Sequence, residues 1–236
     1  MELLKGKTAI ITGASRGIGK GIALAFAQNG ANIAFTYLSS DEKAKALEAE
    51  LSEYGIKAKG FKSDASNFEA AQTLADDVMS TFGSIDVLVN NAGLSLGLDP
   101  IQRANLADWE QMIDTNVKGL LYVSKIVSNW MIENKTGHII NIGSIAGKET
   151  YANGNVYCAT KHAVDSLNKA MRLDLLTSGI RVTAIHPGAV ETEFSVVRFK
   201  GDQQRADKVY EGFEPLRPSD IADAIYYASQ TPAHVN

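Results

Sequence analysis

A glycine-rich turn near the amino terminus constrains the fold of this chain more than any other feature. Thr8–Ile11 is a short apolar run typical of a buried strand, and a helical pattern begins near Ile18. Between them lies the segment Thr12-Gly13-Ala14-Ser15-Arg16-Gly17-Ile18-Gly19. Glycines let a backbone turn sharply and approach a pyrophosphate, and the following helix N-terminus supplies free N–H groups. The turn predicts a dinucleotide-binding α/β fold, with a merely structural tight turn as the alternative.

The rest of the chain repeats this alternation of apolar runs and helical patterns. Further predicted strands cover 31–35, 58–62, 85–89, 138–142 and 181–185. Predicted helices cover about 18–28, 41–54, 68–82, 106–133 and 155–177. Buried strands that are joined through helices require a parallel sheet covered on both faces, and right-handed crossovers make it doubly wound. We therefore expect a single α/β domain of Rossmann type over residues 1–236.

Composition narrows the classes of function. The 236 residues are 45% hydrophobic, and the formal net charge of −4 argues against nucleic acid as the main partner. The one cysteine allows no intramolecular disulfide. The polar start and the lack of a membrane-length apolar run predict a cytoplasmic protein with no membrane partner. The histidines lack metal-ligand spacing, so no metal is expected.

The end of the second predicted strand favours NADP over NAD. NAD-selective folds place a carboxylate there to bind the ribose 2′-hydroxyl, but this chain has none before Asp41. Arg16 could instead reach a 2′-phosphate, and Ser39 or Ser40 could donate hydrogen bonds to it. An ordinary solvated arginine is the alternative interpretation of Arg16.

A serine, a tyrosine and a lysine form the predicted catalytic group. Tyr157 and Lys161 are four residues apart in a helical segment, so their side chains share one face. A nearby ammonium is expected to lower the pKa of a phenol, whose ordinary value near 10 makes it a poor base. Ser144 follows the fifth predicted strand, at the sheet edge where such folds bind ligands. A chance Tyr-x-x-x-Lys pair is the alternative.

The helical and strand patterns loosen after Pro187. Residues 191–218 are expected to form a long excursion with one short helix, and we assign about 188–218 to a substrate loop. Arg198 or Lys200 in this loop could pair with a substrate carboxylate, or both could be solvated surface charges. Ser219-Asp220 is predicted to cap a final helix that runs to about residue 229.

Together these motifs resemble the short-chain dehydrogenase/reductase family over nearly the whole chain. Thr-Gly-x-x-x-Gly-x-Gly occurs at Thr12, Asn-Asn-Ala-Gly at residues 90–93, and Pro-Gly-x-x-x-Thr at Pro187. The resemblance implies a catalytic tetrad of Asn116, Ser144, Tyr157 and Lys161. It implies, with the analysis above, that NADP contacts Gly13, Ser15, Arg16, Gly17, Ile18, Gly19, Ser39, Asp64, Ala65, Asn91, Ala92, Gly93, Tyr157, Lys161, Pro187, Gly188, Val190 and Thr192.

The resemblance also implies a mechanism. Tyr157 exchanges a proton with the substrate oxygen, which Ser144 orients and polarises. Lys161 lowers the pKa of the tyrosine and binds the nicotinamide ribose, and Asn116 holds a water of the proton relay. The hydride passes directly between nicotinamide and the substrate carbon.

The two parts of the chain resemble different members of the family. Residues 1–93 are similar to 3-oxoacyl-acyl-carrier-protein reductases, and the remainder is similar to NADP-dependent 3-hydroxy acid (serine) dehydrogenases, as a natural mosaic or a chimera would be. Because the later loops build the pocket, we expect a small, serine-like 3-hydroxy acid as substrate. Reduction of a 3-oxoacyl thioester and a non-catalytic nucleotide-binding sensor are the alternatives.

Two further expectations come from the resemblance. Family members usually continue into another strand beyond Asn236, so this chain is expected to expose one edge of its sheet. They commonly form homotetramers, here through the predicted helices at 106–133 and 155–177.

Overall fold

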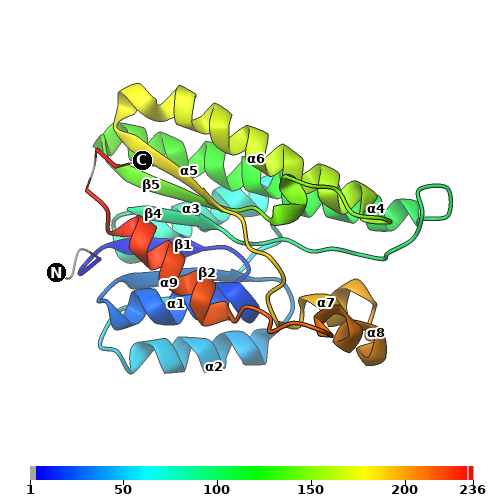
Figure 1. Cartoon of the computed structure of the whole chain (residues 1–236). Coiled ribbons are helices and arrows are strands. Elements are labelled where there is room, and N and C mark those ends of the chain that lie inside the picture. Colours follow the sequence, from blue (N-terminus) through cyan, green and yellow to red (C-terminus); the bar gives the residue numbers. More distant parts are fainter. Residues whose placement is uncertain (1–3, 233, 236) are drawn as a thin grey trace.

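A parallel sheet forms the centre of the computed structural model, which describes residues 4–232 and 234–235 (Figure 1). The first three residues, Ala233 and Asn236 of the predicted domain lie outside the described residues. The strand order is β3-β2-β1-β4-β5-β6, and all five pairings are parallel. The strands are β1 (Thr8–Ile11), β2 (Asn32–Tyr37), β3 (Ala58–Lys62), β4 (Val87–Asn90), β5 (Gly137–Ile142) and β6 (Ile180–Ile185). This order confirms the predicted doubly wound sheet of Rossmann type.

Helices cover both faces of the sheet, as Figure 1 shows with the sheet between two layers. One layer consists of α1 (Gly17–Gln28), α2 (Asp41–Ser52) and α9 (Pro218–Ser229). The other contains α3 (Phe68–Phe82), α5 (Leu120–Asn134) and α6 (Asn155–Leu175). The short helix α4 (Leu106–Ile113) precedes α5. No helix among the described residues is long and apolar enough to cross a bilayer.

Alternation along the strands explains the two layers. Neighbouring residues of a strand point to opposite faces, so an apolar pair serves both cores. In β1, Ile11 packs in the cluster with α1, whereas Ile10 packs in the cluster with α3 and α5. In β4, Val89 and Leu88 divide in the same way. The uniformly apolar runs therefore require helices on both sides.

The predicted helix at 106–133 contains an irregular turn. Residues Asp114–Gly119 between α4 and α5 form a π-helical turn, while the chain stays helical on both sides of it. Such a turn inserts one extra residue into a helix and is frequent at functional sites. It carries Asn116.

Within the described residues, the excursion after β6 contains two α-helices and a 3₁₀ turn at Lys208–Tyr210 rather than one short helix. The α-helices are α7 (Phe194–Arg198) and α8 (Gln203–Asp207), which Figure 1 shows beyond the amino-terminal end of α2. The prediction that Ser219-Asp220 caps the last helix is wrong in detail, because α9 begins at Pro218. Asp220 still contributes to its start, since its carboxylate accepts a hydrogen bond of 2.7 Å from the Arg217 N–H.

β6 and β3 are the outer strands of the sheet that the described residues form. The chain enters the excursion from β6.

Candidate active site

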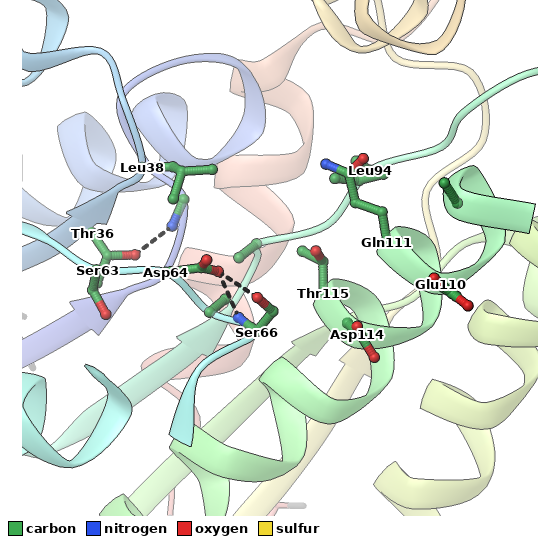
Figure 2. Close-up of a pocket in the computed structure, with 14 residues that line it drawn as sticks. Thr36, Leu38, Ser63, Asp64, Ser66, Leu94, Glu110, Gln111, Asp114 and Thr115 are labelled. Carbon is green, nitrogen blue, oxygen red and sulfur yellow. Dashed lines mark hydrogen bonds between the residues drawn. The ribbon is translucent and has the colours of Figure 1, made fainter. Parts of the chain in front are cut away.

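The crevice at the carboxyl ends of β1 and β4 is where the strand order reverses. Ligands of doubly wound sheets bind at such a switch point. A pocket of about 380 Å³ opens here. Figure 2 shows it between Thr36, Ser63 and Asp64 on one side and α4 with the π turn that follows it on the other. Gly13, Ala65 and Ala92 from the predicted cofactor set also line it.

The glycine turn is shaped by backbone conformation and close packing. Gly13 and Gly17 have φ angles of +65° and +56°, in the left-handed region that side chains disfavour. Gly19 is needed for another reason: a Cβ there would lie 2.5 Å from Asn91 Nδ2 and 2.7 Å from Ala14 Cα. The three positions therefore fix the turn that faces the crevice.

Thr12 and Asn91 clamp this turn to the segment after β4. The Thr12 hydroxyl accepts hydrogen bonds from the backbone N–H groups of Asn91 (3.0 Å) and Ala92 (2.9 Å). The Asn91 amide donates to the carbonyls of Thr12 (2.8 Å) and Gly13 (3.0 Å). The predicted cofactor residue Asn91 thus has a structural task, while Ala92 lies at the pocket and Gly93 lies beside Asn116.

The chemistry of the turn fits a dinucleotide. Helix α1 begins directly after Arg16, whose side chain makes no capping hydrogen bond to the helix. Its first N–H groups and the positive end of its dipole thus remain for an anion such as a pyrophosphate. Ser15 and Ile18 are partly buried in the same turn, with Ile18 packed against the core.

Asp64 and Ala65 lie where the adenine ring was predicted. The Asp64 carboxylate accepts hydrogen bonds from the Ser66 N–H (2.9 Å) and hydroxyl (2.7 Å), the dashed contacts of Figure 2. These bonds fix the carboxylate at the wall of the pocket. Exposed Leu38 lies on the same wall and offers apolar surface to a ring.

Tyr157 and Ser144 meet at the catalytic end. Tyr157 is only 9% exposed, and burial raises its pKa to about 12, while a hydrogen bond with Ser144 acts in the opposite direction. The phenol is therefore protonated at neutral pH. Ser144 caps the short helix after β5, where its Oγ accepts from the Ala146 N–H at 3.1 Å.

Lys161 lies one helical turn further along α6, as predicted. Its amine donates a hydrogen bond of 2.9 Å to the Ile142 carbonyl, and burial lowers its pKa to about 8. The prediction that this lysine lowers the pKa of Tyr157 stays a prediction, since the overall shift has a larger cause. Burial dominates at the phenol, and its pKa is raised.

Asn116 braces the site through its side chain. Its amide donates to the Leu94 carbonyl (2.8 Å) and the Thr160 hydroxyl (3.1 Å), and its oxygen accepts from the Leu94 N–H (2.8 Å). The π turn thereby joins the segment after β4 to α6. The predicted water-holding role of Asn116 stays a prediction.

The segment from Pro187 to Thr192 runs along the glycine turn. The Thr192 side chain lies 3.6 Å from the position that a Cβ on Gly17 would occupy. The buried Pro187 accepts a hydrogen bond of 3.0 Å from the Ile145 N–H, and Ile145 also borders Gly188. The predicted cofactor residue Val190 is buried in the core, and its carbonyl accepts from the Tyr210 hydroxyl at 3.1 Å.

The side chains of Arg198 and Lys200, in the predicted substrate loop, contact different parts of the molecule. Lys200 pairs with Asp108 at 2.9 Å on the surface. Arg198 lies over the rings of Tyr157 and Tyr151, at 6.0 Å and 5.4 Å from their centroids. Sequence reasoning missed Tyr151 as a neighbour of the site, and no motif marks it.

The outer end of the predicted cofactor site carries Arg16 and Ser39. Both are exposed, and Ser39 is the second residue after the end of β2. Arg16 lies 3.5 Å from the carboxylate of Glu193, which the sequence did not single out. Among the described residues no group of acidic, histidine or cysteine side chains could hold a metal ion.

Comparisons with known proteins agree with this geometry. A family model described as short chain dehydrogenase matches residues 7–203. An NADP-dependent 3-hydroxy acid dehydrogenase of Salmonella typhi is 46% identical over 228 residues, covering 96% of this chain and 90% of that protein. A serine 3-dehydrogenase of Rhizobium radiobacter is 38% identical over 229 residues, covering 97% and 90%. The solved closed form of a serine dehydrogenase complexed with NADP+ superposes with a TM-score of 0.92 at 43% identity, covering 97% of this chain and 91% of that one.

Proposed function

The chain belongs to the short-chain dehydrogenase family, and from this premise we propose that it is an NADP-dependent oxidoreductase of a small, serine-like 3-hydroxy acid. The reaction interconverts the hydroxyl and carbonyl forms of the substrate by hydride transfer. Four of the predicted dinucleotide contacts support the cofactor, because Gly13, Asp64, Ala65 and Ala92 line one pocket from separate segments.

The guanidinium of Arg198 is the observation that carries the substrate class. Its Nε donates to the Gly97 carbonyl at 3.0 Å, but its Nη2 is buried and has no hydrogen-bond partner among the described residues. A buried unpaired donor of a cation is costly. Beside the Tyr157 ring, it fits the carboxylate of a substrate whose reacting carbon faces the phenol. Residues 188–218 thus act as the substrate loop.

Proton transfer to the substrate oxygen is the task of Tyr157. Its raised pKa keeps the phenol protonated, so it is ready to donate a proton in carbonyl reduction and must first lose that proton in alcohol oxidation. Ser144 holds the same oxygen by a hydrogen bond as charge develops on it. NADP, when bound, supplies the nicotinamide ring that gives or takes the hydride.

Lys161 and Asn116 support this transfer from behind the phenol. The amine of Lys161 uses one donor on the Ile142 carbonyl, which leaves N–H groups for the hydroxyls of the nicotinamide ribose. Asn116 fixes Leu94 and α6 relative to each other, and we propose that it also holds the relay water. Both residues therefore position groups on which the proton transfer depends.

A paired substitution tests the substrate class. We expect Arg198→Gln to raise KM for L-serine or 3-hydroxypropionate about a hundredfold, because a buried charge-assisted contact is lost. The methyl ester of the same acid, which lacks the charge, should respond far less. Lys200→Gln is the matched control in the same loop and should leave both values nearly unchanged. Initial rates at 340 nm with NADP measure each.

The same assay separates the alternatives. Activity with an acetoacetyl thioester and none with the free acids would make the chain a 3-oxoacyl-thioester reductase. Absence of turnover with every substrate, together with tight NADP binding, would favour the nucleotide-binding sensor. Equal KM effects of Arg198→Gln on the acid and its methyl ester would remove the carboxylate from the proposal.

A homotetramer in the cytoplasm completes the proposed function. Apolar side chains are exposed on the helices that would form the interfaces, with Leu121 at 37% and Leu173 at 76% exposure. Light scattering coupled to size exclusion should give four times the chain mass of 25.4 kDa. Cell fractionation checks the compartment.

A further inference from the structure

Three charged side chains from distant segments meet at the outer end of the crevice. Arg16 belongs to the glycine turn, Lys43 to the first turn of α2, and Glu193 to the substrate loop, directly before α7. Lys43 Nζ lies 2.5 Å from Glu193 Oε1, and Arg16 Nε lies 3.5 Å from Glu193 Oε2. One carboxylate therefore bridges two cations that belong to the cofactor half of the molecule.

The surroundings mark this bridge as the place for a ribose phosphate. Ser39 and Ser40 lie between the end of β2 and the start of α2, where the adenosine ribose is expected in this fold. Thr192, next to Glu193 in the chain, packs over Gly17 in the glycine turn. The bridge thus lies beside the turn that faces the pyrophosphate. Its cations are the type of group that a 2′-phosphate requires.

In this structure the Glu193 carboxylate is the anion that pairs with Arg16 and Lys43. Lys43, followed by Arg16, holds the pKa of Glu193 below its ordinary value, so the carboxylate is charged. All three side chains are nearly half exposed, at 46–49%. Exposed ion pairs contribute little free energy, so this one is easily exchanged for a stronger anion.

We infer that Lys43 joins Arg16 as a ligand of the NADP 2′-phosphate, and that Glu193 occupies their cations until the phosphate displaces it. A phosphate monoester carries more charge than a carboxylate and has three acceptor oxygens, so it is the stronger partner. When the phosphate displaces Glu193, this residue directly before α7 no longer pairs with the glycine turn and α2. Binding of the 2′-phosphate is thereby coupled to the part of the substrate loop that leads into α7. The inference rests on the proposed NADP preference.

Two ligands without a nicotinamide ring isolate this site: 2′,5′-ADP carries the extra phosphate and 5′-AMP does not. We expect Lys43→Met to weaken 2′,5′-ADP binding about tenfold and Glu193→Gln to tighten it about threefold, both with 5′-AMP nearly unchanged. Isothermal titration at low salt gives the dissociation constants, since salt screens exposed charges. Lys62→Met, in another exposed pair beside α2, is the matched control and should change neither.

The double variant of Lys43 and Glu193 gives a second measure, because the effects of two interacting residues on affinity do not add. If Glu193 competes for Lys43, Glu193→Gln should help much less when Lys43 is already methionine. Weaker 2′,5′-ADP binding by Glu193→Gln would overturn the displacement, and an unchanged affinity of Lys43→Met would remove Lys43 from the site. Equal affinity of the wild-type chain for 2′,5′-ADP and 5′-AMP would instead refute the NADP preference itself. Turnover enters none of these outcomes.

Discussion

The two ends of the cofactor crevice are built in opposite ways. At the catalytic end, Tyr157, Ser144 and Lys161 are at most 9% exposed, and burial moves the pKa of the tyrosine up and that of the lysine down. At the outer end, Arg16, Lys43 and Glu193 are nearly half exposed and hold one another through ion pairs. The buried end fixes geometry and proton affinity, whereas the exposed end allows one anion to replace another.

The sharpest test of this contrast is removal of the buried phenol. We expect Tyr157→Phe to lower kcat by about a thousandfold or more, equivalent to about 4 kcal/mol, since the ring still fills its place but carries no proton. The affinity for NADP, measured by titration, should change little. An active Phe variant would show that another group transfers the proton.

The glycine turn lies between the two ends of the crevice. The next largest effect, on the free energy of unfolding, is expected from the close packing at Gly19. Gly19→Ala should destabilise the chain by about 3 kcal/mol, because the new Cβ would meet Asn91 Nδ2 and backbone atoms at 2.5–2.8 Å. Chemical denaturation measures this change. Gly55→Ala is the control: nothing lies within 4 Å of its Cβ, so only its left-handed backbone contributes, at about 1 kcal/mol. Equal losses would argue against tight packing at the turn.

Burial also shifts the pKa of a histidine in the sheet. His138 in β5 is 3% exposed, and burial, followed by the charge of Arg181, lowers its pKa to about 3. The unfolded chain, with an ordinary pKa near 6.5, therefore binds the proton more tightly between these values. Stability should fall as pH drops through this window, by about 2 kcal/mol at about pH 5.

Unfolding in urea at several pH values checks this dependence. A His138→Gln variant should be less stable at neutral pH but should lose most of the pH dependence in that window. If the wild-type and variant slopes coincide, the histidine is not the group that titrates.

The smallest effect is expected for an exposed pair near the outer end. Lys20 on α1 and Glu50 on α2 lie 2.8 Å apart, with side chains 40% and 42% exposed. Glu50→Gln should change the free energy of unfolding by less than about 1 kcal/mol and leave the kinetics unaltered. Urea titration and initial rates measure these values. A loss as large as that of Gly19→Ala would break the contrast between buried and exposed regions.

Most of the fold was accessible from sequence because the relevant signals are local. Apolar runs such as Thr8–Ile11 report burial on both faces, and the glycine turn reports its own backbone conformation. The spacing of Tyr157 and Lys161 needs only the helical repeat to bring them onto one face. The resemblance of the chain to its family then supplied the remaining predicted site residues.

Features that depend on distant partners were not accessible. Arg198 and Lys200 differ in role because Lys200 meets Asp108, which lies 92 positions earlier in the chain. Glu193 joins Arg16 and Lys43 only after the substrate loop has folded back over the glycine turn. The π turn at Asn116 also lacks a local signal, since its contacts are made to Leu94 and Thr160.

The π turn at Asp114–Gly119 also decides how the helix around it accommodates a change in length. Its hydrogen bonds span five residues rather than four, so this turn takes up one residue more than an α-turn does. The core-facing stripe of α5, formed by Val123, Val127 and Met131, therefore keeps its phase toward the sheet despite the extra residue. Deleting one residue here would convert the turn to an ordinary α-turn and displace Asn116 from Leu94 and Thr160, while α5 keeps its packing.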